Sequence, residues 1–162
     1  MHFRKIVFGL FVLFFIPACG QMTFEEKLAQ LYHHTVPQLK AAELASREEV
    51  VILDIRSIDE FNVSHIEGAK LIDYDSFNEQ DVKDIDKSAE IIVYCSVGYR
   101  SEKVGEKLLE MGFPKVLNLY GGIFEWKNNG FEVYNDRGVT DSVHTYNQKW
   151  SQWLKNGVKV YE

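Results

Sequence analysis

Short, wholly apolar segments alternate with helix-like segments along the middle of this 162-residue chain, and this alternation limits the fold more than any other feature. Apolar runs such as Val50-Val51-Ile52-Leu53 and Ile91-Ile92-Val93-Tyr94 are typical of strands buried on both faces of a parallel sheet. Strands and helices that alternate in this way form parallel sheets with right-handed crossover connections. We therefore predict an α/β domain, with strands at 50–54, 70–72, 91–94 and 115–119 and helices at 24–33, 37–45, 58–63, 77–84, 102–111 and 123–128.

Cys95 lies where a parallel α/β fold gathers its reactive groups, at the carboxyl end of the 91–94 strand. Backbone N–H groups of a tight loop and of the first helical turn have no intrahelical partner, and with the helix dipole they favour a thiolate over a thiol. Gly98 allows the loop to turn tightly, and Arg100 adds a fixed positive charge. These features favour a reactive Cys95 over the alternative, a small buried apolar residue at a strand end.

Three segments resemble signatures of the rhodanese (sulfurtransferase) family. The loop from Cys95 to Ser101 fits the family pattern C-x-x-G-x-R-S. Residues 50–69 resemble the first signature, an apolar strand followed by Asp-x-Arg, Glu-Phe and His-Ile-x-Gly-Ala, and residues 120–126 are similar to the Gly-Gly-x-x-x-Trp segment. The resemblance covers residues 35–134 and implies a rhodanese-like domain, in which helices lie on both faces of a central parallel five-stranded sheet.

The resemblance also implies a reaction, the transfer of sulfur through a persulfide on Cys95. The thiolate would attack the outer sulfur of a small anionic donor such as thiosulfate, and a thiol or cyanide acceptor would then take that sulfur. Backbone N–H groups of the loop would hold the negative sulfur, so that no metal ion or organic cofactor is needed. The loop residues are Ser96, Val97, Gly98, Tyr99, Arg100 and Ser101, of which Val97 and Tyr99 are expected to line the pocket mouth.

Arg100 and a group of upstream side chains complete the candidate site. Arg100 either neutralises the anionic group of the donor or pairs with a carboxylate such as Glu60 or Asp54 and fixes the loop, and we favour the pairing. Asp54, Arg56, Glu60 and His65 resemble scaffold positions of the family. For Asp54, Arg56 and His65 a buried hydrogen-bonding role is favoured over proton transfer.

Two other classes of function stay open. Phosphatases and arsenate reductases of related folds also use a cysteine and an arginine on one loop, but the phosphatase-type loops that this one resembles enclose five residues, whereas Cys95 and Arg100 enclose four. A tetrahedral oxyanion needs the wider ring of N–H groups, while a single sulfur atom fits the smaller one. The other alternative is a non-catalytic binding module, or a carrier that hands persulfide sulfur to a partner.

The N-terminus has the charged, apolar and small-residue regions of a secretory signal. Arg4 and Lys5 precede an apolar run from Ile6 to Ile16, which is shorter than the roughly 20 residues that a membrane-spanning helix needs. The residues that follow, Ile16-Pro17-Ala18-Cys19, are similar to a bacterial lipobox, in which the cysteine becomes the lipidated first residue. An ordinary signal peptide with an incidental cysteine is the alternative.

These features predict how the N-terminal part of the chain is organised. We expect residues 1–18 to be removed as a lipoprotein signal peptide and residues 19–34 to form a tether and a first helix. The lipid on Cys19 would anchor the chain to a membrane on its periplasmic side. Because Gly20 is not the Asp that retains similar lipoproteins at the inner membrane, we expect the outer membrane.

Charge and cysteine content exclude some functions. The formal net charge is −6 and the chain has no run of basic residues, which argues against a nucleic-acid partner. Cys19 and Cys95 are the only cysteines. A lipid on Cys19 would therefore rule out an internal disulfide, and Cys95 without a second thiol cannot follow a dithiol mechanism.

Residues 135–162 are an aromatic-rich extension beyond the family pattern. The spacing of its large apolar residues predicts an amphipathic helix within residues 139–162, with one face formed by Val143, Tyr146, Trp150, Trp153 and Leu154. We favour packing of this helix onto the flank of its own domain, because exposed tryptophans are costly. A contact with a partner protein or with a second copy is the alternative, since interfaces are rich in Trp and Tyr.

The lipoprotein assignment predicts that Cys19→Ala abolishes membrane anchoring. No later apolar run approaches the length of a spanning helix, so anchoring must come from a lipid at Cys19 or from an uncleaved signal. Labelling with a fatty-acid analogue and partition into the detergent phase measure this, and Cys95→Ser serves as the control that keeps both. Wild-type protein in the soluble periplasmic fraction with an unmodified N-terminus would show that the assignment is wrong.

Overall fold

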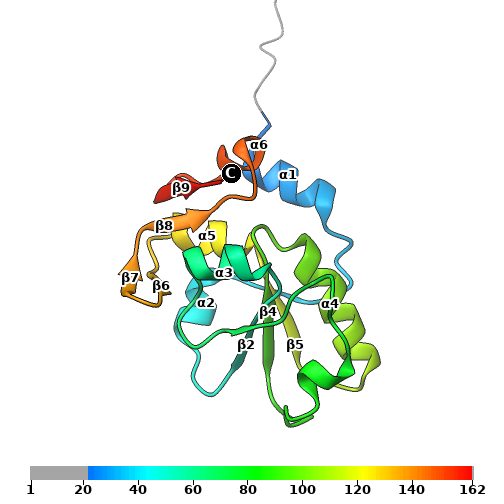
Figure 1. The fold of residues 1–162 in the computed structure, drawn as a ribbon. Coiled ribbons are helices and arrows are strands. Elements are labelled where there is room, and N and C mark those ends of the chain that lie inside the picture. The colour runs from blue at the N-terminus through cyan, green and yellow to red at the C-terminus, as the bar shows by residue number, and fades with distance from the viewer. Residues whose placement is uncertain (1–21, 162) are drawn as a thin grey trace, which may run out of the picture.

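Five parallel strands form the central sheet of the computed structural model, which describes residues 22–161 (Figure 1). Their spatial order is β1-β5-β4-β2-β3, so the middle strand β4 pairs with β5 on one side and with β2 on the other. The strands are β1 (Gln38–Leu39), β2 (Val51–Asp54), β3 (Lys70–Leu71), β4 (Ile91–Tyr94) and β5 (Val116–Leu119). All four residues of β4 are buried, as expected for a strand that is covered on both faces.

Helices cover both faces of the sheet, as predicted. Side chains alternate along a strand, and in β4 Ile91 and Val93 pack with Leu108 in one hydrophobic cluster, whereas Ile92 and Tyr94 pack with Phe124 in another. The helices are α1 (Phe24–Leu31), α2 (Ala41–Ala45), α3 (Ile58–Val63), η1 (Glu79–Val82), α4 (Tyr99–Glu110), α5 (Gly122–Asn128) and α6 (Gln148–Ser151). Leu108 belongs to α4 and Phe124 to α5, so these two helices lie on opposite faces.

The N-termini of α1 and α3 are fixed by local hydrogen bonds. Ser57 accepts the backbone N–H of Glu60, and the Glu60 carboxylate accepts the N–H of Ser57, which is a reciprocal capping box. Thr23 and Glu26 form the same pair at the start of α1. At α3 this cap has a second consequence, because it holds the Glu60 carboxylate close to the end of β4.

Two predicted helices are wrong in extent or type. The segment 37–45 does not begin as a helix at Pro37: it first forms β1, and α2 starts at Ala41. Pro37 lacks an N–H but has a free carbonyl, which accepts the N–H of Asn118 and starts the pairing of β1 with β5 at the sheet edge. The segment 77–84 contains only the 3₁₀ helix η1, in which Val82 is the single buried residue. Phe77, the other apolar residue of this segment, packs against the core from outside η1, so the apolar contacts do not follow one helical face.

The long helix predicted within residues 139–162 is also wrong. A hairpin of β6 (Val133–Asn135) and β7 (Gly138–Thr140) leads into the extension, and a parallel pair of β8 (Ser142–His144) and β9 (Val158–Val160) follows on either side of the short α6. Left-handed residues interrupt a helical path, with Tyr146 at φ 63° and Gly157 at φ 114°. The apolar spacing therefore arises from a strand, a turn and one helical turn in succession.

The extension packs against its own domain. Trp153 stacks on Phe24 of α1 with ring centroids 5.5 Å apart, and Val143, Trp153 and Leu154 are buried within one of the two core clusters. Figure 1 shows α6 beside α1, and β8 packs against α3. Four of the five residues predicted to share one helical face, Val143, Trp150, Trp153 and Leu154, are thus brought together by packing between segments, whereas Tyr146 is exposed.

The predicted signal segment 1–18 and Cys19 lie outside the described residues. Within residues 22–161 the structure contains no helix that is both long enough and apolar enough to cross a membrane.

Candidate active site

Cys95 begins the loop between β4 and α4 and is buried, with 1% of its surface exposed. The helix that follows starts at Tyr99, three residues earlier than the predicted start at 102, so its N-terminus adjoins the loop directly. Gly98 is the N-cap residue, with φ 95°, and its N–H donates to the Cys95 Sγ at 3.1 Å. Sγ is therefore close to the positive end of a helix of 12 residues, which favours negative charge on sulfur.

Four successive carbonyls of the loop are hydrogen-bonded from outside. Cys95 O accepts the Ile123 N–H (3.0 Å) and Ser96 O accepts the Phe124 N–H (3.2 Å). Val97 O accepts the Tyr32 hydroxyl (2.7 Å), and Gly98 O accepts Asn118 Nδ2 (2.9 Å). The described chain has no cis peptide bond. In a trans peptide the C=O and the next N–H point in opposite directions, so outward carbonyls turn the N–H groups of residues 96–99 inward.

Gly98 and Gly122 are required for this arrangement, because neighbouring atoms leave no room for a Cβ atom at either position. A Cβ on Gly122 would lie 2.2 Å from Cys95 O, and one on Gly98 would lie 2.2 Å from the Tyr32 hydroxyl oxygen. Gly122 has φ 56° and starts α5, so the first N–H groups of that helix reach the carbonyls of Cys95 and Ser96. The Gly-Gly segment of the sequence thus serves the loop as well as the turn.

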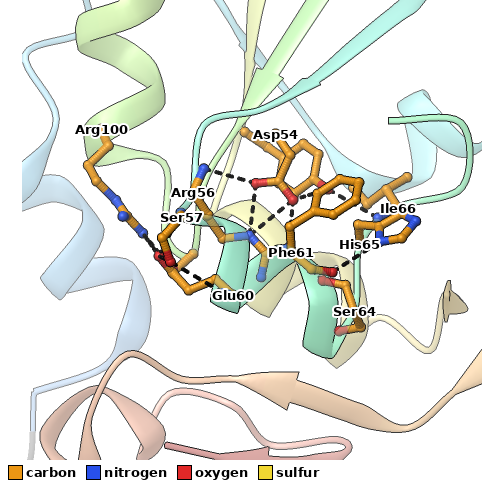
Figure 2. A network of polar contacts seen from close by, with 11 residues as sticks. Asp54, Arg56, Ser57, Glu60, Phe61, Ser64, His65, Ile66 and Arg100 are labelled. Carbon is orange, nitrogen blue, oxygen red and sulfur yellow. Dashed lines mark hydrogen bonds and ion pairs between the residues drawn. The ribbon is translucent and has the colours of Figure 1, made fainter. Parts of the chain in front are cut away.

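Arg100 pairs with Glu60 (Figure 2), the interpretation that the sequence favours. Its Nη2 donates to the two carboxylate oxygens at 2.8 and 3.0 Å and to Ser96 Oγ at 3.2 Å. The Ser96 hydroxyl in turn donates to Glu60 at 2.7 Å. The guanidinium therefore ties the loop to the start of α3.

The charges of this pair are mutually stabilised. Burial acts to raise the pKa of the Glu60 carboxyl, but the hydrogen bonds and charge of Arg100 and the Ser96 hydroxyl outweigh it and lower the pKa from 4.5 to about 2. Burial acts to lower the pKa of the Arg100 guanidinium, while negative charge on Cys95 and the bonds to Glu60 raise it above its ordinary value. Both groups are charged at neutral pH.

Asp54 and Arg56 form a second ion pair deeper in the domain (Figure 2). Both side chains are fully buried, and Arg56 donates to the Asp54 carboxylate through Nε at 2.9 Å and through Nη2 at 2.6 Å. Arg56 Nη2 also donates to Ser64 O, and the Tyr94 hydroxyl donates to Asp54 at 2.6 Å. These bonds join the ends of β2 and β4 to α3, which makes the pair a scaffold for the site.

The remaining predicted residues, His65 and Ser101, hold neighbouring segments. His65 stacks on Phe61 with ring centroids 3.9 Å apart, and its Nδ1 lies 3.1 Å from Phe61 O (Figure 2). The backbone N–H of His65 donates to Tyr134 O, so this residue connects α3 to β6 and does not contact the loop. The Ser101 hydroxyl donates to Asn118 Oδ1 at 2.7 Å and helps to orient the amide that holds Gly98 O.

Three residues that support the loop were missed by sequence reasoning. Tyr32 is buried below the loop: its hydroxyl donates to Val97 O and accepts the N–H of Gly121 at 2.8 Å. Burial raises the pKa of this phenol, so it keeps the proton that it donates. Glu102 is buried and accepts the N–H groups of His33 and Thr35, which fixes the segment after α1. Asn118 carried a signal, a lone polar residue within the apolar run of β5, whereas the role of Tyr32 depends on tertiary structure.

A hollow of about 350 Å³ opens above the cysteine. Its lining residues are Leu31, Tyr74, Asp75, Cys95, Ser96, Val97, Tyr99, Arg100, Tyr146 and Trp150. Val97 and Tyr99 lie at this pocket, where they were expected. Within the described part of the chain no group of three or more His, Cys, Asp or Glu side chains is placed to hold a metal ion.

Comparison with known proteins gives one consistent family. The Rhodanese-like domain family matches residues 38–129. The chain is 33% identical over 97 residues to "Thiosulfate sulfurtransferase GlpE" of Coxiella burnetii, a match that covers 60% of this chain and 90% of the relative. It is 36% identical over 87 residues to "tRNA uridine(34) hydroxylase" of Cytophaga hutchinsonii, where it covers 51% of this chain and only 28% of the relative.

Solved structures agree with the fold. The crystal structure of the BH2092 protein from Bacillus halodurans superimposes with a TM-score of 0.58 at 25% identity, and the match covers 71% of this chain and 85% of that one. The relatives share the domain around the loop, while the activities in their names differ.

Tyr32→Phe should loosen the loop. The change leaves Val97 O and the Gly121 N–H buried without a partner, which we expect to lower the free energy of unfolding by about 1–3 kcal/mol. It should also lower the rate of reaction at Cys95 several-fold, because the peptide that presents the Gly98 N–H to sulfur is less fixed. Urea unfolding and steady-state rates measure both effects. Tyr120→Phe is the matched control, since the Tyr120 hydroxyl bonds to none of the described residues; equal effects of the two changes would contradict the role of Tyr32.

Glu60→Gln should remove a pH-dependent part of the stability. Because the folded pKa of about 2 lies below the unfolded value of 4.5, ionised Glu60 stabilises the fold fully above pH 4.5, and this stabilisation is lost as pH falls toward 2. The difference in unfolding free energy between wild type and variant should therefore shrink by about 3 kcal/mol from pH 7 to pH 2. Urea unfolding at several pH values tests this. Glu90→Gln, at a half-exposed pair with Arg47, should change by less than about 1 kcal/mol; a constant Glu60→Gln difference would contradict the prediction.

Proposed function

The chain belongs to the rhodanese-like domain family, and from this membership and the geometry of the Cys95 loop we propose that it is a sulfurtransferase that carries sulfur as a persulfide on Cys95. The observation that carries the proposal is the loop itself, in which four carbonyls are held outward and the Gly98 N–H is directed at Sγ. Such a ring of N–H groups stabilises a negative sulfur atom without a metal ion or an organic cofactor.

The reaction has two steps. The Cys95 thiolate attacks the outer sulfur of a donor such as thiosulfate, the sulfur–sulfur bond of the donor breaks, and sulfite leaves with the bonding electron pair. The persulfide that results carries its negative charge on the terminal sulfur, inside the ring of N–H groups. A cyanide ion or a thiolate then attacks that sulfur, and the Cys95 thiolate is released for the next cycle.

Arg100 supports sulfur transfer over phosphatase chemistry. A phosphatase arginine directs its guanidinium toward the oxyanion in the loop, whereas here Nη2 is bonded to Glu60 and Ser96. Only four residues separate Cys95 from Arg100, which leaves a ring suited to one sulfur atom. The ion pair instead fixes the loop, and its charge stabilises negative sulfur at short range.

The place of action is a separate proposal that rests on the sequence of the N-terminus. We propose that the mature chain is exported and held by a lipid on Cys19 on the periplasmic side of the outer membrane. The donor and acceptor would then be small molecules of that compartment, and Cys95 would act without a second thiol.

Thiosulfate should add one sulfur atom to Cys95. We expect the intact mass to increase by about 32 Da after incubation with thiosulfate, and cyanide to remove the increase as thiocyanate is formed. Cys95→Ser should show neither the adduct nor turnover and should stay folded, because a hydroxyl is close in size to a thiol but cannot form a persulfide. Cys19→Ala is the control, since it removes the only other cysteine and should keep the adduct. A wild-type protein that forms no adduct with any sulfane donor would be a non-catalytic module.

A further inference from the structure

Part of the pocket wall comes from outside the family domain. Tyr146 and Trp150 line the same hollow as Cys95, but they belong to the C-terminal extension, beyond the residues 38–129 that match the family. Figure 1 places this extension, with α6, over the end of the domain where the loop and α1 meet. The extension therefore adds side chains to the site that the family domain alone lacks.

The backbone conformation of Tyr146 is energetically unfavourable and is held in place by neighbouring contacts. Its φ of 63° is left-handed, a region that side chains other than Gly, Asn and Asp rarely occupy. Hydrogen bonds fix the segment: Tyr146 N–H donates to His144 Nδ1 at 3.1 Å, and the buried Thr145 donates its N–H to Val160 O at 2.7 Å. The tyrosine side chain is nonetheless 59% exposed, so burial does not account for its placement.

Tyr146 and Trp150 face the charged and apolar parts of the pocket. The Tyr146 ring lies over Arg100, with the guanidinium carbon 5.9 Å from the ring centroid. Trp150 is half-buried in α6, and its backbone N–H donates to the side chain of the N-cap residue Asn147. The Lys27 Nζ lies 5.7 Å from the centroid of the Trp150 ring. Leu31, Tyr74 and Tyr99 supply further apolar surface around the same hollow.

The charges at the pocket do not favour a compact dianion. Arg100 is the one cation among the lining side chains described, and it is paired with Glu60. Asp75 adds a negative charge to the lining. The volume of about 350 Å³ is also at the lower end of the range of small-molecule sites, and exceeds what a five-atom anion fills. The mouth thus offers aromatic surface and room, but no uncompensated positive side chain.

We propose that Tyr146 and Trp150 are specificity-determining residues that select sulfane donors with an aromatic or bulky apolar body and a single negative charge, the class of organic thiosulfonates. This inference rests on the proposed persulfide mechanism and names its donor class. The Cys95 thiolate takes the outer sulfur of R–SO₂–S⁻, the sulfur–sulfur bond breaks, and R–SO₂⁻ leaves with the electron pair, so no further reactant is needed. The R group lies against the two aromatic rings.

The test compares two donors, benzenethiosulfonate and thiosulfate, with cyanide as the acceptor. Selectivity is the ratio of kcat/KM for the first donor to that for the second. Tyr146→Ala and Trp150→Ala should each lower this ratio about ten-fold, which corresponds to about 1.4 kcal/mol, whereas Tyr146→Phe keeps the ring and should keep the ratio. Tyr134→Ala, an equal truncation in β6, beyond the family match but away from the pocket, should leave the ratio unchanged.

A stability measurement separates a specificity role from a structural one. Tyr146→Gly adopts a φ of 63° without strain, so the melting temperature should stay within a few degrees of the wild type or rise, while the ratio falls as in Tyr146→Ala. A wild type that forms the Cys95 persulfide but shows the same ratio as Tyr146→Ala and Trp150→Ala would overturn the inference. A wild type that forms no persulfide with either donor would instead overturn the proposed sulfurtransferase function.

Discussion

The outward hydrogen bonds of the loop carbonyls are the interaction on which the site depends. A peptide that binds the Cys95 sulfur through its N–H must direct its carbonyl away, and a buried carbonyl without a partner is costly. The structure meets this need with donors from three distant parts of the chain, the Tyr32 hydroxyl after α1, the Asn118 amide in β5 and the first N–H groups of α5. The loop can therefore take its reactive form only when these elements have assembled around it, which couples the chemistry to the complete fold.

Two arginine–carboxylate pairs, whose carboxylates Asp54 and Glu60 lie six residues apart in the chain, fix the position of the loop. Asp54 and Arg56 are fully buried and join β2 to β4 and α3, while Glu60, one helical segment later, holds Arg100 (Figure 2). Buried ion pairs add little net stability, because desolvation offsets much of their attraction, but removal of one partner is strongly destabilising. Their effect here is geometric. Glu60 both caps α3 and receives Arg100 and Ser96, so the helix start sets the position of the cysteine loop.

The parts of the fold that could be predicted are those in which local pattern and tertiary role agree. The apolar runs of β2, β4 and β5 need burial on both faces, and the loop after β4 carries its own turn and charge residues, so both were evident in the sequence. β1 was missed because two residues at a sheet edge give no periodic signal, and Pro37 beside it also suits a helix start. The prediction for the C-terminal extension was wrong for another reason. Its apolar spacing is that of a helix, but Tyr146 and Gly157 have positive φ and interrupt any helix there. Tyr32 could not be found because only the folded chain brings it under residue 97.

The family domain forms the cysteine loop, whereas the extension forms part of the pocket wall above it. Residues 95–100 and their hydrogen-bond partners form the floor of the pocket, and in the proposed mechanism they bind the transferred sulfur atom. The aromatic rings of Tyr146, between β8 and α6, and of Trp150, in α6, reach the same hollow. This part of the chain is held by the pairing of β8 with β9 and by the stacking of Trp153 on Phe24. Neither ring donates a hydrogen bond to the loop among the contacts described, so a change in either alters the wall and leaves the N–H ring in place. A binding surface built in this way can diverge while the proposed persulfide chemistry stays constant, because the two are coupled through packing and not through shared hydrogen bonds.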